Sequence, residues 1–262
     1  PVATRSGYGS HSRDLVRSLI AMDKFDIHIN SLRWGNCPMN ALDESKPEDV
    51  EILSRILKNN ELSRQPEIHI QISVPNEFTP IAKYNIGITA GIENTAPKAE
   101  WIQGMNRMNM NIVPSKFVKG IFESVSYEEI NEQTKQKTGE LKCTSPIEVL
   151  FEGVDTKVYG KTKDISDDLK TEMSNIEERF VFLYTGHWLQ GDLGHDRKDT
   201  GMLLKTFLET FKNKPNPPAL VMKTSGATFS IIDRNEIKQK IEEIKDTVKG
   251  KLPPVYFLHG DL

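Results

Sequence analysis

Two cations stand between an apolar run and a helical pattern in the second half of the chain. The apolar run spans residues 180–184, Arg197 and Lys198 follow it, and apolar residues at helical spacing begin at Met202. A strand that leads through a glycine-bearing loop into a helix can bind an anion. The first N–H groups of the helix lack partners within it, lie at the positive end of its dipole and point toward the ligand. Cations at that place suit a phosphate. An ordinary solvated loop with two surface cations is the open alternative.

Three further residues belong to the same candidate phosphate site. Gly186 and His187 come directly after the first apolar run, and Lys223 ends a second apolar run over 219–222. Lys223 could reach the phosphate that Lys198 binds, although a lysine whose stem covers the sheet edge would look the same. His187 is equally consistent with a phosphate neighbour and with a structural residue.

A second glycine-bearing segment opens the chain. Gly7 and Gly9 precede a helix whose apolar face includes Leu15 and Leu19. Glycine lets a backbone approach a ligand closely, so we expect these two residues beside a diphosphate or a sugar. A plain tight turn is the alternative.

Strands and helices alternate along most of the chain, and this alternation predicts an α/β fold with mostly parallel sheets. Alternating or continuous apolar runs indicate strands, and two side-chain pairs, Ser45 with Glu48 and Asp233 with Glu236, indicate helix starts. The polar segment 126–144 is interpreted as a surface insertion with weak helical tendency. The predicted strands cover 25–29, 68–74, 85–90, 112–113, 147–151, 180–185, 219–223 and 255–259.

We expect two Rossmann-like domains, residues 1–163 and 164–262, with a polar stretch at the boundary. Ligands in such folds sit beyond the carboxyl ends of the strands. If the domains face each other, the glycine segment at 7–10, the loop at 90–94 and the two cationic segments line one cleft.

Composition limits the function further. The chain has 262 residues, of which 37% are hydrophobic and 27% charged, and Lys+Arg (34) nearly balances Asp+Glu (37). The lack of a basic excess argues against nucleic-acid binding. Neither a membrane-spanning run nor a signal-like core is visible, so we expect a cytoplasmic protein with at most peripheral membrane contact. Two distant cysteines, Cys37 and Cys143, are expected as free thiols.

Four segments, in order along nearly the whole chain, resemble the retaining glycosyltransferases of the GT-B fold, in the group that includes glycogen synthase and sucrose synthase. The four resembling segments are SGYGSHSRDLVRSL (6–19), MNMNIVPSKFVKGIF (108–122), IEVLFEGVDTKVYG (147–160) and the strand, loop and helix of 182–207. The resemblance implies transfer of a sugar from a nucleotide-activated donor to a carbohydrate, lipid or protein acceptor that the sequence does not identify. It implies retention of anomeric configuration, no metal ion, and no cofactor besides the donor itself.

The resemblance also assigns roles to residues. Residues 1–163 would face the acceptor and residues 164–262 would bind the nucleotide sugar. The arginine and lysine that hold the diphosphate in this family fall here on His187 and Lys198, with Arg197 adjacent. The family's catalytic-region histidine is absent, and Glu93 is the nearest ionisable residue, expected to orient the acceptor or contact the sugar. The chain is expected to be truncated at both ends, lacking a first strand and the family's acidic donor motif.

Two other functions remain open at this point. One is a non-catalytic module of the same fold that binds a nucleotide sugar or a glycan, since His187 replaces an arginine and the family's histidine is missing. The other is an epimerase that acts on a nucleotide sugar and needs no acceptor.

Overall fold

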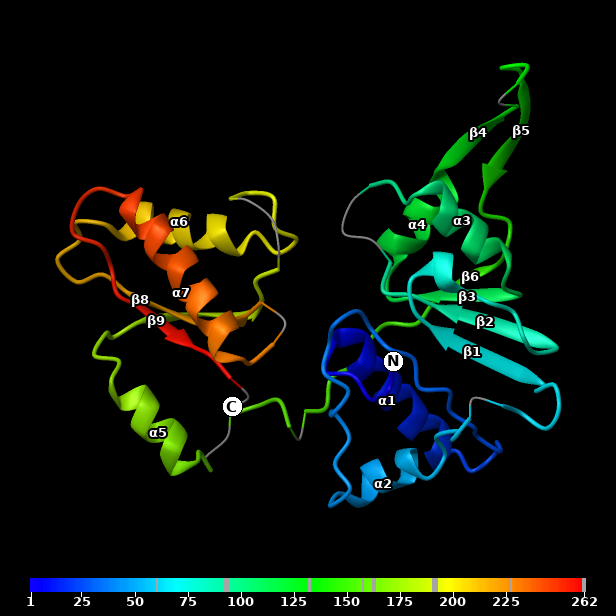
Figure 1. Ribbon diagram of the computed structural model, residues 1–262, viewed down its shortest axis with the longest axis horizontal. Coiled ribbons are helices and arrows are strands. Elements are labelled where there is room, and N and C mark those ends of the chain that lie inside the picture. Colours follow the sequence, from blue (N-terminus) through cyan, green and yellow to red (C-terminus); the bar gives the residue numbers. More distant parts are fainter. Residues whose placement is uncertain are drawn as a thin grey trace. The chain divides into compact units, whose positions relative to one another are not determined.

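The chain folds into two units, Pro1–Tyr159 and Gly160–Leu262, in the computed structural model (Figure 1). This division falls close to the predicted boundary between residues 163 and 164. The structure describes residues 1–59, 61–91, 95–131, 133–156, 158–161, 164–189, 193–226 and 228–260.

A parallel four-stranded sheet forms the centre of the first unit, in the order β1-β2-β3-β6. It is built from β1 (Ile68–Ile72), β2 (Tyr84–Ile88), β3 (Met110–Val113) and β6 (Ile147–Val149). The accompanying helices are α1 (Gly7–Ala21), α2 (Pro47–Leu53), the short 3-10 helix η1 (Pro75–Glu77), α3 (Ala99–Asn106) and α4 (Lys116–Ser124). The predicted parallel α/β architecture is therefore confirmed for this unit.

The apolar core of the first unit explains why α3 and α4 pack as they do. Phe78, Met105 and Phe122 are fully buried in one cluster with residues of β3 and β6. Helix α4 begins where the sequence predicts, because the Ser115 hydroxyl accepts a hydrogen bond from the Val118 amide at 3.2 Å.

Two local predictions for the first unit are wrong. Residues 25–29 form no strand; only an isolated bridge joins Ile29 to Ile56, because no strand among the described residues continues the ladder beside them. Ser45 does not cap α2: Pro47 opens the helix, and the Ser45 hydroxyl donates instead to the Asp43 carboxylate at 2.7 Å. In both places a local pattern is overridden by the contacts available in the fold.

The polar segment 126–144 is a hairpin and not a weak helix. Antiparallel strands β4 (Ser126–Ile130) and β5 (Lys137–Lys142) extend away from the four-stranded sheet (Figure 1). The turn is held by Asn131, whose side-chain oxygen accepts from the amides of Gln133 and Thr134 at 2.9 Å. An asparagine side chain that replaces a backbone acceptor in this way stabilises a turn.

The second unit has a parallel three-stranded sheet of order β7-β8-β9. Trp188, Leu204, Met222 and Ile237 join strand and helix residues in its core. This unit also confirms the α/β prediction, and both units are consistent with Rossmann-like domains. Its elements are α5 (Asp167–Ser174), β7 (Val181–His187), α6 (Thr200–Phe211), β8 (Ala219–Ser225), α7 (Ile231–Asp246) and β9 (Val255–Leu258).

Helix α7 starts earlier than predicted. Ser230 is its cap and accepts a hydrogen bond from the Asp233 amide at 3.1 Å, so Asp233 is not the capping residue. None of the helices in the described ranges is both long enough and apolar enough to cross a membrane.

Candidate functional site

The carboxyl ends of β7 and β8 meet at the second unit's candidate site. His187 and Ser225, the last residues of the two strands, are register partners. The Nδ1 atom of His187 lies 3.2 Å from the Ser225 hydroxyl oxygen. Parallel pairing thus brings side chains that are 38 positions apart in the sequence to one edge of the sheet.

Lys198 lies against the end of β7. A Cβ atom added to Gly186 would come within 3.1 Å of Lys198 Cδ and 3.3 Å of its Nζ. Glycine at this position therefore leaves the space that the lysine side chain crosses. Within the described part of the chain, the Lys198 ammonium has no ion-pair or hydrogen-bond partner. Arg197, its neighbour, is exposed.

Lys223 approaches the same edge from β8. Its ammonium donates a hydrogen bond to the carbonyl of Gly260 and lies 5.3 Å from the centre of the Phe229 ring. These contacts hold the cation at the end of the sheet without neutralising it, because neither a carbonyl nor an aromatic ring carries a formal charge.

The imidazole of His187 responds to both cations. Burial lowers the pKa of His187 most, the charges of Lys198 and Lys223 lower it further, and the charge of Asp233 opposes them. A histidine whose pKa is depressed below its ordinary value is neutral at pH 7. The site therefore combines two ammonium groups with a neutral imidazole.

Asp233 ties together three segments around the site. One carboxylate oxygen lies 2.7 Å from His259 Nε2, just beyond β9, and the other accepts from the Gly226 amide at 2.8 Å in the loop after β8. The sequence analysis missed His259 and took Asp233 for a cap. No local signal could have revealed their contact, which joins residues 26 positions apart.

The start of α6 differs from the expectation. The buried carboxylate of Asp196 accepts hydrogen bonds from the amides of Lys198, Thr200 and Gly201 at 3.1–3.3 Å. The prediction of unpartnered amides at this helix start is therefore wrong for Thr200 and Gly201, because the carboxylate of the preceding loop already accepts from them.

The glycine segment of the first unit also differs. Residues 7–9 form the first turn of α1, and Ser6 caps it by accepting from the Gly9 amide at 2.9 Å. A Cβ on Gly9 would lie 2.2 Å from the Thr4 carbonyl oxygen, whereas a Cβ on Gly7 would meet nothing within 4 Å. Gly9 is thus small in order to pack against the chain itself, and Gly7 alone of the pair faces open space.

Tyr8 is a second residue that the sequence analysis missed. Its hydroxyl lies 3.0 Å from the Thr89 hydroxyl and accepts from the Ala90 amide at 3.0 Å, at the carboxyl end of β2. Its ring stacks on Trp34 with centroids 4.1 Å apart. Burial raises the pKa of Tyr8. Glu93, the predicted catalytic residue, lies outside the described residues.

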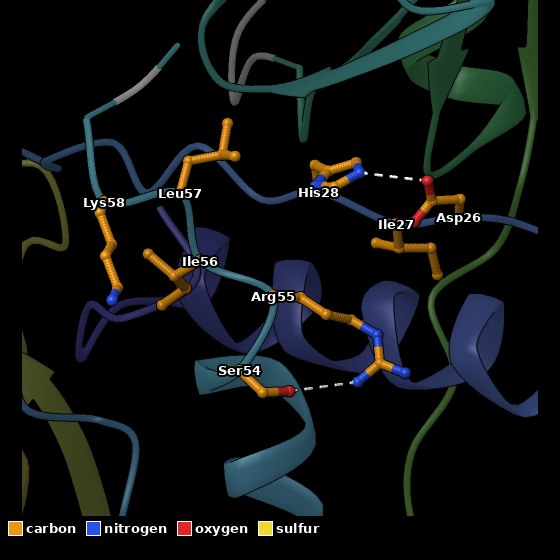
Figure 2. Close-up of a pocket in the computed structure, with 8 residues that line it drawn as sticks. All are labelled: Asp26, Ile27, His28, Ser54, Arg55, Ile56, Leu57 and Lys58. Atoms are coloured by element: carbon orange, nitrogen blue, oxygen red, sulfur yellow. Dashed lines mark hydrogen bonds and ion pairs between the residues drawn. The ribbon is translucent and has the colours of Figure 1, made fainter. Parts of the chain in front are cut away.

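Surface depressions are present in both units. One of about 490 Å³ in the first unit is lined by a histidine–aspartate pair, with His28 Nε2 3.2 Å from the Asp26 carboxylate. Figure 2 shows that the Arg55 and Lys58 side chains there point in different directions, so their charges do not converge on one ligand. A smaller one in the second unit, of about 210 Å³, adjoins Trp188 and Asp196.

In the described ranges, no group of three histidine, cysteine, aspartate or glutamate side chains is arranged to hold a metal ion.

Comparison with known proteins adds one structural neighbour. No protein-family model matches the chain, and no curated protein matches it. Among solved structures, the apo structure of OtsA is similar over 68% of this chain, with 10% sequence identity and a TM-score of 0.40. The chain spans about half of that structure, 48% of its length.

Proposed function

We propose that this chain is a glycosyltransferase that moves a sugar from a nucleotide-activated donor to an acceptor, with retention and without a metal ion. The observation that carries the proposal is the convergence of Lys198, Lys223 and His187 on the carboxyl ends of two parallel strands. Ligands of such sheets bind beyond this edge. The resemblance of four ordered segments to retaining GT-B enzymes supplies the reaction type.

The chemistry needs cations where the proposal puts them. When a glycosidic bond to a nucleoside diphosphate breaks, negative charge grows on the phosphate oxygens. Ammonium groups aimed at those oxygens stabilise the transition state more than the ground state. Lys198 and Lys223 would take this role, and these two cations would substitute for a metal ion.

The remaining residues take supporting roles in the proposal. Gly186 leaves room for Lys198, and exposed Arg197 extends the positive region. Gly7 would allow a close approach to donor or acceptor, while the space beside Gly9 is already filled. Glu93 is assigned to the acceptor side on the resemblance alone.

A non-catalytic module that binds a nucleotide sugar or a glycan is the second candidate. The Asp196 carboxylate favours it, because it occupies the amides of α6 that would otherwise help to stabilise a leaving diphosphate. Such a module would bind the donor but release no product.

Product release separates the two candidates. We expect free nucleoside diphosphate when the chain is incubated with a panel of nucleotide sugars and mono- or oligosaccharide acceptors, measured by a coupled phosphate-release assay. A variant with Lys198→Ala should lose this release, and Lys238→Ala, an exposed lysine on α7, is the matched control. Tight donor binding without release would reject the enzyme and leave the binding module. If no nucleotide, nucleotide sugar or glycan binds, both candidates fail.

A further inference from the structure

His187 stands apart from the two lysines of the phosphate site, because its charge can change near neutral pH. An imidazole titrates in this range, whereas an ammonium group remains charged throughout it. His187 can therefore meet a phosphate either as a neutral imidazole or as a charged imidazolium.

The ring has one nitrogen engaged and one available. Nδ1 lies 3.2 Å from the Ser225 hydroxyl, which fixes the ring at the strand end. Among the described residues, Nε2 has no hydrogen-bond partner, and it is not a buried unsatisfied atom. Nε2 is therefore free to donate to a ligand.

The charged groups around the ring come from three directions. Lys198 reaches it from the loop before α6, Lys223 from β8, and Asp233 from α7. The Asp233 carboxylate is itself occupied by His259 and by the Gly226 amide, and no bond between Asp233 and His187 is present in the described residues. Without a ligand, burial and the two cations lower the pKa of His187 more than Asp233 raises it, so the imidazole is neutral at pH 7.

A bound phosphate reverses this balance. Its negative charge offsets both ammonium groups and adds an attractive charge next to Nε2, and a nearby opposite charge favours the protonated ring. We infer that His187 binds the phosphate as an imidazolium, so that the anion and one proton enter the site together. This inference rests on the proposed function, because it concerns the same phosphate site.

The direction of the pH dependence follows from linkage. The pKa of His187 is lowered in the free chain and rises when the anion binds, so between these two values the complex holds more protons than the free chain. Binding therefore tightens as the pH falls through that interval, by at most about tenfold per pH unit for one linked proton. The anion's own protonation acts in the opposite sense, and a histidine variant separates the two effects.

The test is calorimetric titration with inorganic pyrophosphate, the group that all nucleoside diphosphates share. Each titration is repeated at pH 6–8 in buffers of different ionisation enthalpy, which gives the number of protons taken up. We expect uptake by the wild-type chain to exceed that of His187→Gln by up to one proton. The affinity ratio between the two should widen toward about tenfold as the pH falls. His28→Gln, which changes an exposed histidine of the first unit, should match the wild type.

Three outcomes would count against the inference. Equal proton uptake by wild type and His187→Gln overturns it while the phosphate site survives. Absence of pyrophosphate binding overturns the site and the inference together. If His187→Gln does not fold, NMR titration of the wild-type imidazole decides: an unchanged His187 pKa at saturating pyrophosphate overturns the inference, and a raised pKa supports it.

Discussion

The starts of helices α1 and α6 both lie in glycine-bearing segments with the sequence pattern of a phosphate site, yet their surroundings differ. The Ser6 hydroxyl accepts from the Gly9 amide at the start of α1, and the Asp196 carboxylate accepts from the Thr200 and Gly201 amides at the start of α6, so both helix starts already have a side-chain acceptor. In the second turn of α1, the guanidinium of Arg13 donates to the carbonyls of Val2 and Thr4 at 2.8 and 2.9 Å. Lys198, next to α6, has no such partner among the described residues.

This contrast shows that side-chain cations, and not the glycine pattern, distinguish the two segments. In the first unit the glycine, the arginine and the capping serine all serve the packing of residues 1–9. In the second unit a glycine makes room for a lysine at the end of a strand. The same local pattern therefore has a structural role in one unit and presents charge in the other.

The largest expected effect is on anion binding by the second unit. The double variant Lys198→Ala/Lys223→Ala should weaken pyrophosphate binding by at least about a hundredfold, since each charge-assisted hydrogen bond contributes about 1.5–3 kcal/mol. Calorimetric titration measures the loss, with Lys238→Ala as control. Affinity within threefold of the wild type would remove the proposed difference between the two units.

Next in size is the effect of Gly9→Ala on the stability of the first unit. The added Cβ would press on the Thr4 carbonyl, so we expect a loss of about 2 kcal/mol, as for other overpacked sites. Gly7→Ala adds the same methyl group to open space and should change stability by less than about 0.5 kcal/mol. Urea denaturation followed by Trp34 fluorescence checks both, because Trp34 stacks on Tyr8. Equal stabilities would mean that Gly9 is not a packing residue.

The smallest effect is expected from Asp196→Ala. Removing the carboxylate that accepts from the first amides of α6 should lower the free energy of unfolding of the second unit by about 1–2 kcal/mol. It should also strengthen pyrophosphate binding severalfold, because the Lys198 amide and the first two amides of α6 would become available to an anion. Trp188 in the core reports the unfolding, and Glu209→Ala on the exposed face of α6 is the control. A variant as stable as this control would show that the Asp196 hydrogen bonds contribute nothing to the stability of the second unit.

Local sequence signals were sufficient for some elements of the first unit. The strict alternation at Ile68–Ile72 predicted β1, and Ser115 predicted the start of α4. They failed at residues 25–29, where the alternation is real but the described residues form only an isolated bridge between Ile29 and Ile56. They failed again at 126–144, where polar composition gave no strand signal and the hairpin depends on its own cross-strand pairing and turn.

The sequence by itself determined the alternating α/β order, the parallel pairing of strands and the positions of the candidate cations. The positions of strands and helices follow from periodicities of two and 3.6 residues, which are properties of short stretches, and their alternation implies parallel pairing. Tertiary structure alone decided that Asp196 occupies the start of α6, that Thr4 fills the space beside Gly9, and that Lys198 and Lys223 act on His187. Such contacts depend on the path of the backbone in space, because the choice of partner for a side chain is set by distance and not by sequence separation.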